Sequence, residues 1–135
     1  MLQPSIFKIQ LKKINAKKSG RTSYATKPIV TCSIGLTGKE RKSNYYNLYV
    51  RHLFGFENIN WKYVEVGFFD NNLLIGEGTE SDFLVSGKIQ SISSKNLCET
   101  IFNFFNVRIP KNADEFQTIT LECIKFDRFY KLVKA

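Results

Sequence analysis

The chain of 135 residues contains only three cysteines and one histidine. It therefore has few of the side chains that form disulfide frameworks, metal sites and the acid–base groups of hydrolytic enzymes. Cys32, Cys98 and Cys123 are odd in number, widely spaced and set among apolar neighbours. They are expected to be small core residues, forming neither a disulfide framework nor a metal site. His52 lies between Arg51 and Leu53, without an acidic neighbour to set its tautomer. Glycine-rich nucleotide-binding loops are also absent from the sequence, so we predict a non-enzyme that needs no cofactor and no metal.

Long apolar runs are missing as well. No segment approaches the roughly 18 consecutive apolar residues that a membrane-spanning helix requires. The first residues, MLQPSIFKIQLKK, lack the basic-then-apolar order of a signal peptide. We therefore expect no membrane association and a cytoplasmic location. With 12 Phe and 6 Tyr, residues 1–135 are sufficient for one domain with a genuine core.

Acidic residues are nearly absent from the first part of the chain. Residues 1–51 contain eleven Lys or Arg and one acid, Glu40, which gives a net charge of +10. Residues 52–135 contain nine basic and eleven acidic residues, which gives −2, so the N-terminal part is basic and the C-terminal part neutral to acidic. Charged groups are costly to bury, and so this asymmetry predicts a basic face on the folded protein.

A basic face of this kind favours a phosphate backbone as partner, because neutralising phosphates releases counterions. The sequence therefore predicts nucleic-acid binding, DNA in particular, through the basic loops 15–27 and 37–44. Tyrosines among the cations can stack on bases. The candidate binding residues are Lys12, Lys17, Lys18, Arg21, Tyr24, Lys27, Lys39, Arg41, Lys42, Tyr45 and Arg51.

Two alternatives stay open, because no RNP1, helix-turn-helix or zinc-finger spacing can be read from the sequence. The basic face can be a solvated surface that keeps the protein soluble. It can also belong to an interaction or inhibitor protein of a phage or mobile element, docking on an acidic protein surface or in a nucleic-acid channel. Binding to bare DNA or RNA distinguishes these readings.

The hydrophobic pattern predicts an α+β fold, with a β-rich antiparallel sheet and one main helix at about 95–106 packed against it. Alternating apolar residues predict strands at 6–14, 30–36 and 119–123, and a last strand through 130–132. The segment 61–75 predicts a hairpin with a turn at 70–72. Shorter strands are expected at 83–85 and near Ile89, and Ser93-Ser94 is a helix cap. Residues 48–54 fit a short helix or a strand, closed by Gly55.

From Asn47 the chain reads NLYVRHLFGF and then WKYVEVGFFDNNLLI, and this order resembles the swapped-hairpin DNA-binding domains of the AbrB type. In that family a strand leads into a short helix ending in Leu-Gly, followed by a hairpin with an acidic-Asn/Gly turn. The resemblance, which covers residues 47–75, implies a dimeric β-rich DNA-binding protein. Leu53-Phe54-Gly55 would match the helix end and Asp70-Asn71-Asn72 the turn. The chain departs from the pattern at Tyr49-Val50, where the family has Ile-Pro, and lacks its Gly-Arg pair. Exposed sheet edges are a second reason to expect a homodimer.

Overall fold

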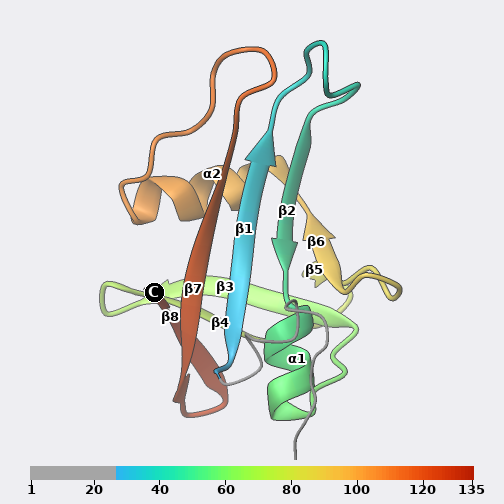
Figure 1. Ribbon diagram of the computed structural model, residues 1–135. Coiled ribbons are helices and arrows are strands. Elements are labelled where there is room, and N and C mark those ends of the chain that lie inside the picture. The colour runs from blue at the N-terminus through green and yellow to red at the C-terminus, as the bar shows by residue number, and fades with distance from the viewer. Residues whose placement is uncertain (1–26) are drawn as a thin grey trace, which may run out of the picture.

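The computed structural model describes residues 27–135, so the strand expected at 6–14 and nearly all of the loop 15–27 lie outside the described residues. The described part is a β-rich α+β fold (Figure 1). Its elements in chain order are β1 (Ile29–Gly35), β2 (Tyr45–Tyr49), α1 (Arg51–Glu57), β3 (Tyr63–Phe69), β4 (Asn72–Glu77), β5 (Phe83–Leu84), β6 (Ser91–Ser93), α2 (Lys95–Phe104), β7 (Phe116–Phe126) and β8 (Phe129–Lys134).

The strands form one antiparallel sheet with the order β5-β3-β4-β8-β7-β1-β2-β6. The sheet curves until its two outer strands meet, because an isolated bridge joins Ser86, just after β5, to Ser91 at the start of β6. The Ser86 N–H donates to the Ser91 carbonyl at 2.8 Å, and the Gln90 N–H donates to the Ser86 carbonyl at 2.8 Å. The sheet is therefore nearly closed, and the expected β-rich antiparallel architecture is confirmed. Ile89, near which a strand was expected, instead lies exposed in the turn between these bridge residues.

The strands follow the period-2 pattern of the sequence. In β1, Val30, Cys32 and Ile34 are fully buried, and Cys32 lies between Leu48 of β2 and Ile119 of β7. The β3–β4 hairpin closes through a two-residue turn in which Asp70 and Asn71 have φ values of 54° and 64°. Asn and Asp tolerate this left-handed conformation better than other side chains, so the predicted hairpin is confirmed.

Two helices accompany the sheet, so the expectation of one main helix holds only in part. Helix α2 begins after Ser94, whose side chain accepts from the Leu97 N–H at 3.1 Å, and it ends two residues before the expected position. The ambiguous segment 48–54 divides into the end of β2 and the start of α1. Helix α1 continues past Gly55, which was expected to close it, and ends at Asn58 with φ 58° and ψ 50°. The AbrB-type family assignment stays a prediction.

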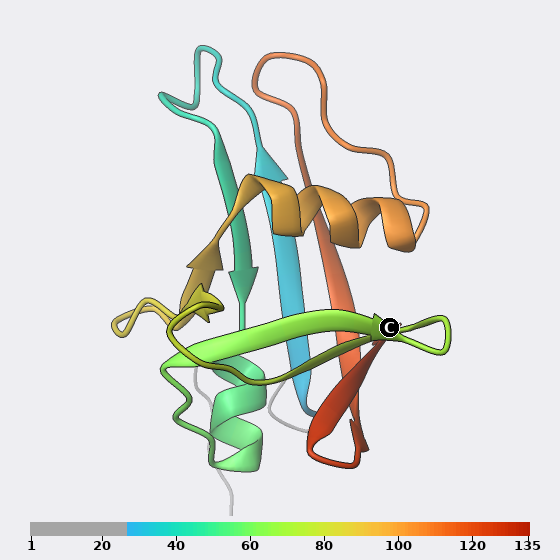
Figure 2. The same ribbon diagram turned by 180° about the vertical axis from the view of Figure 1, so that it is seen from behind.

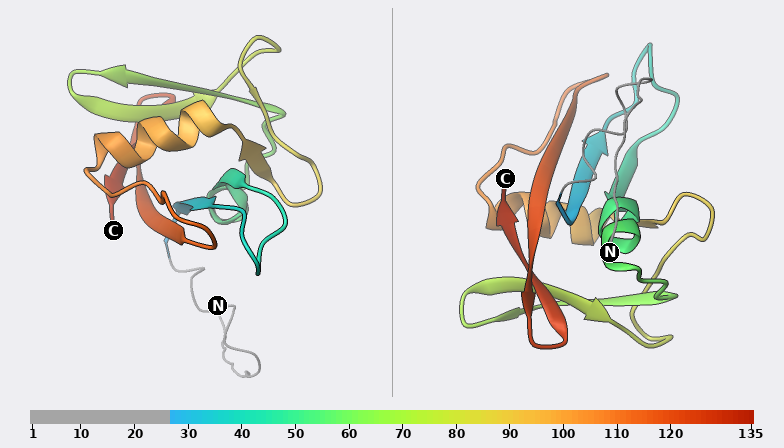
Figure 3. Two further views of the ribbon diagram at one scale, coloured as in Figure 1. Left: turned by 90° about the horizontal axis from the view of Figure 1, so that it is seen from above. Right: turned by 60° about the horizontal axis from the view of Figure 1, so that its bottom comes forward.

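Helix α2 crosses the inner face of β7, β1 and β2, and the β3–β4 hairpin lies on the same side of these strands (Figure 2). Seen from above, the helix lies between that hairpin and the β7–β1–β2 face (Figure 3). Its buried residues, Leu97, Cys98, Ile101 and Phe102, join the core contributed by the strands. The three cysteines are unpaired and buried, as expected for small core residues.

Candidate nucleic-acid interface

The structure brings together some of the predicted binding residues and separates others. Lys39, Arg41, Lys42 and Tyr45 lie at the end of the sheet where β1 ends and β2 begins, at the top of Figure 1. Lys27 precedes β1 and Arg51 follows β2, so both lie at the opposite end of these antiparallel strands. Lys27 also forms an ion pair with Glu122 at 2.8 Å. The predicted residues Lys12, Lys17, Lys18, Arg21 and Tyr24 lie outside the described residues.

The basic loop 37–44 takes its shape from a single carboxylate on a distant part of the chain. Asp114, in the connection from α2 to β7, accepts from the backbone N–H groups of Lys39 at 2.7 Å, Glu40 at 2.8 Å and Arg41 at 3.1 Å. Desolvation raises the pKa of Asp114, but these three donors and the Arg41 charge together lower it below its ordinary value. The ionised Asp114 carboxylate thus holds the loop in shape, and its negative charge is engaged by three backbone N–H groups.

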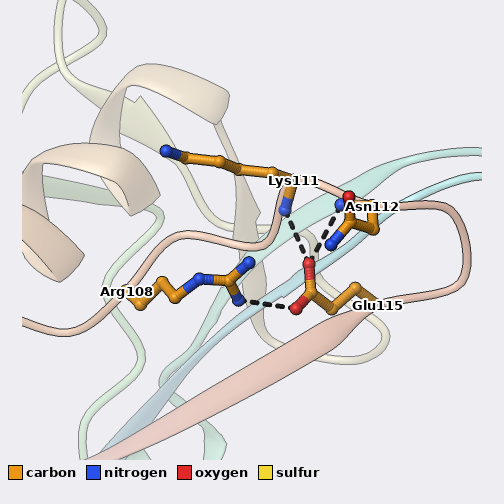
Figure 4. A network of polar contacts seen from close by, with 4 residues as sticks. All are labelled: Arg108, Lys111, Asn112 and Glu115. Atoms are coloured by element: carbon orange, nitrogen blue, oxygen red, sulfur yellow. Dashed lines mark hydrogen bonds and ion pairs between the residues drawn. The ribbon is translucent and has the colours of Figure 1, made fainter.

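Glu115 organises the neighbouring loop in the same way (Figure 4). Its carboxylate accepts from the Arg108 guanidinium at 2.5 Å and from the backbone N–H groups of Lys111 at 2.8 Å and Asn112 at 2.9 Å. The Arg108 hydrogen bond, followed by those from Asn112 and Lys111, lowers the pKa of Glu115 to about 2. The two loops are joined as well, since the Leu36 N–H donates to the Glu115 carbonyl at 3.0 Å. We refer to loops 37–44 and 105–115 together as the loop end of the molecule.

The loop end has more cations than available anions. Of its three acidic side chains, Asp114 and Glu115 are engaged by backbone donors and by Arg108, and the exposed Glu40 is not. Lys39, Lys42 and Lys111 form no ion pair within residues 27–135. Lys39 and Lys42 are exposed. Cations placed in this way can meet a phosphate without first breaking an internal salt bridge, which favours anion binding at this end.

Beside these lysines, Arg41 lies between two aromatic rings. Its guanidinium carbon is 5.5 Å from the centroid of Tyr45 and 5.4 Å from that of Phe116. Tyr45 of β2 and Phe116 of β7 are both paired with Gly35 of β1, one on each side. Gly35, Tyr45 and Phe116 therefore lie on the same, outer face of the sheet. A side chain at Gly35 would overlap the Tyr45 ring, and so glycine permits this arrangement. Phe116 is 57% exposed, which leaves an aromatic face beside a cation.

Sequence reasoning missed Phe116 and Lys95, both of which lie near Tyr45. The Lys95 ammonium is 5.9 Å from the ring centroid of Tyr46. A signal for Phe116 exists, because Ile119, Leu121 and Cys123 point inward, and extending their alternation backward places residue 116 on the outer face. No local sequence pattern identifies Lys95. It lies beside β2 only because β6, which ends two residues before Lys95, pairs with β2.

A second exposed surface lies where the β3–β4 and β7–β8 turns and the end of α2 come together. Phe68 contacts Phe104 with ring centroids 5.5 Å apart, and Phe69 contacts Phe126 at 6.1 Å. We name these four residues the phenylalanine surface. Their exposed fractions are 59, 36, 59 and 41%, which amounts to about two whole side chains, or on the order of 400 Å² of apolar area. Three of the four, Phe68, Phe69 and Phe126, also line a groove of about 340 Å³. Its other lining residues include Gly67, Leu74 and the carboxylates Glu65 and Asp127.

Other kinds of site have little support in the described part of the chain. Across residues 27–135, no group of three or more His, Cys, Asp or Glu side chains is placed to hold a metal ion. The described helices are all too short or too polar to span a membrane. His52 is half-buried in α1, and desolvation followed by the Arg51 charge lowers its pKa. Comparisons with protein-family models, curated proteins and solved structures found no match to the chain.

Proposed function

We propose that the protein binds nucleic acid through the loop end, with Lys39 and Lys42 contacting phosphates and the Arg41–Tyr45–Phe116 cluster contacting bases or sugars. One observation carries this proposal: two of the three acidic side chains of the loop end, Asp114 and Glu115, are engaged in holding the loops, while its lysines form no ion pair among the described residues. Residues 1–26 add six further cations and no acid to the chain. The protein has no catalytic role in this proposal and needs no cofactor. It acts in the cytoplasm, and dimerisation and DNA preference stay predictions.

The test is fluorescence anisotropy with labelled DNA and RNA at several salt concentrations. The double variant Lys39→Gln/Lys42→Gln should weaken binding, and the slope of log K against log salt should fall by about two, because each phosphate contact contributes about 0.9. Lys88→Gln/Lys134→Gln removes the same charge from two exposed lysines outside the loop end and serves as the matched control. Equal losses in the two double variants would show that only net charge matters, and would contradict a site at the loop end.

Protein binding is the second candidate function, and the phenylalanine surface is the observation that favours it. Its two ring pairs together expose about as much area as the largest patch on a typical monomer, about 300–600 Å², which is often functional. This area is divided between them, because the successive residues Phe68 and Phe69 point to opposite faces of β3. It falls short of the roughly 800 Å² per partner of a standard interface. If no nucleic acid binds even at low salt, the basic face would instead serve an acidic protein surface, as in an interaction protein of a phage or mobile element.

A further inference from the structure

A polar pocket lies beside the Arg41–Tyr45–Phe116 cluster, where strand β2 extends beyond its short neighbour. Strand β6 pairs with Asn47, Leu48 and Tyr49, so the first two residues of β2 have no strand beside them on that side. The chain turns into α2 at this point, and the Ser94 N–H donates to the Tyr46 carbonyl at 3.1 Å. The resulting pocket has a volume of about 330 Å³, and its lining residues are Asn44, Tyr45, Tyr46, Asn47, Ser93, Ser94 and Lys95.

The pocket combines flat aromatic surface with fixed hydrogen-bonding groups. The side-chain oxygen of Asn44 accepts from both the backbone N–H and the hydroxyl of Thr37, at 2.7 and 2.6 Å. Asn47 is fixed in a similar way, because it accepts from the Ser93 hydroxyl at 2.7 Å and donates to the Tyr49 hydroxyl at 3.2 Å. These bonds hold two amide groups in the wall of the pocket and leave the Asn44 amide nitrogen without a partner among residues 27–135.

The pocket also contains one cation, Lys95. Lys95 lies against the Tyr46 ring and forms no ion pair in the described part of the chain. A nucleobase is recognised by stacking on an aromatic ring and by hydrogen bonds to its edge, and its phosphate by a cation. Each of these groups lines the pocket, and Tyr45 connects it to Arg41 and the exposed ring of Phe116.

We infer that this pocket holds an unpaired nucleotide, so that the protein binds single-stranded nucleic acid in preference to a duplex. The inference rests on the nucleic-acid binding proposed above and specifies its substrate class. A base inside a duplex is already stacked and paired, and cannot enter a pocket at the edge of β2 without leaving its partner. An unpaired base can contact Tyr45 while its neighbour lies over Phe116.

The experiment compares one labelled single-stranded DNA, the RNA of the same sequence and a fully paired blunt duplex at equal salt. The single strands should bind at least about tenfold more tightly than the duplex. The substitution Tyr45→Leu should remove about tenfold or more of the single-strand affinity, the usual loss for one stacked base. Tyr63→Leu, which replaces a half-buried tyrosine of β3 outside the pocket lining, is the matched control and should change the affinity much less.

Lys95→Gln is an independent test of the pocket, because Lys95 is exposed and its replacement leaves the core unchanged. It should lower the salt slope for single strands by about one, whereas Lys88→Gln should not. Equal binding of duplex and single strand, or equal effects of Tyr45→Leu and Tyr63→Leu, would overturn the pocket and leave the proposed phosphate contacts of Lys39 and Lys42 intact. Failure of all three nucleic acids to bind the unaltered protein would overturn both. The DNA and RNA arms distinguish the two sources of an unpaired nucleotide.

Discussion

The loop end and the turns beside the phenylalanine surface belong to the same sheet, yet different forces fix their chain connections. At the loop end, eight-residue and longer connections keep their shape because two carboxylates accept six hydrogen bonds, five of them from backbone N–H groups. The β3–β4 and β7–β8 connections are two-residue turns. Their shape is fixed by the register of the paired strands and by residues with positive φ, such as Asn71. Ionised side chains therefore hold the polar region, whereas backbone conformation holds the apolar one.

This difference has consequences for what each region displays. Carboxylates that hold a loop are removed from the surface, so the cations around them dominate there. A tight turn needs no such groups, and the exposed positions beside it are free to be phenylalanine.

The first prediction concerns a buried residue that joins the β3–β4 hairpin to β7. Leu132 of β8 is paired with Leu73 of the β3–β4 hairpin on one side and with Cys123 of β7 on the other, and is 2% exposed. Leu132→Ala should lower the free energy of unfolding by about 2–5 kcal/mol, the usual range for a buried leucine. Urea denaturation followed by circular dichroism measures this. Phe69→Ala removes a larger but mostly exposed side chain and should cost less than about 1 kcal/mol. A similar loss in both variants would mean that the phenylalanine surface is part of the core.

The second prediction tests the turn that depends on backbone conformation. Asn71 has φ 64°, a value that alanine adopts only with strain, so Asn71→Ala should destabilise the protein by about 1 kcal/mol. Asn71→Gly should cost less than Asn71→Ala, because glycine adopts this conformation without strain. Thermal unfolding of the two variants measures the difference. Equal midpoints would show that the turn does not depend on this residue's conformation.

The third prediction is that acid affects the loop end before it affects the hairpin. The folded pKa of Glu115 is about 2, below its ordinary value of 4.5. Its stabilising contribution is therefore complete above pH 4.5 and is lost as the pH falls from about 4.5 to about 2. In the folded protein, the amide resonances of Lys111 and Asn112, whose N–H groups donate to this carboxylate, should titrate with a midpoint near pH 2, while that of Leu73 should stay constant. In Glu115→Gln the titration of the two amides should disappear. Its persistence would assign it to another group.

The fourth and smallest effect is the reactivity of the cysteines beneath both regions. Burial, followed by the charges of Glu57 and Glu122, raises the pKa of Cys123 to about 12, and Cys32 and Cys98 are fully buried. A soluble thiol reagent at neutral pH should therefore modify almost none of the three in the native protein and all of them in urea. Rapid reaction of one cysteine in the native state would reveal a local opening.

Local sequence patterns were sufficient for much of this fold. The alternation of Val30, Cys32 and Ile34 identified β1, and Ser94 before an apolar helical pattern identified the start of α2. Helix α1 is hard to predict from the sequence, because its N-cap is Val50, whose side chain has no hydrogen-bond acceptor. Strands β5 and β6 have two and three residues, too few to show a period, so the near-closure of the sheet was not predictable from local sequence.

The candidate site was predictable only where its members are neighbours in sequence. Lys39, Arg41, Lys42 and Tyr45 lie within seven positions of one another and share the loop end. The linear charge count grouped Lys27 and Arg51 with them, but the antiparallel pairing of β1 and β2 places these two at the other end. Phe116, Asp114 and Lys95 reach the site through long-range strand pairing and loop contacts, which charge counts and hydrophobic periods do not encode.

The short bridge between Ser86 and Ser91 also bears on how the protein behaves at high concentration. A curved sheet whose outermost strands hold each other offers few unpaired backbone groups to another chain, and this protects against self-assembly into fibres. The bridge involves a few residues around one turn, so a small local opening would uncover the outer edges of β5 and β6 together. Substitutions in this turn are therefore expected to change shelf life and aggregation more than they change the melting temperature.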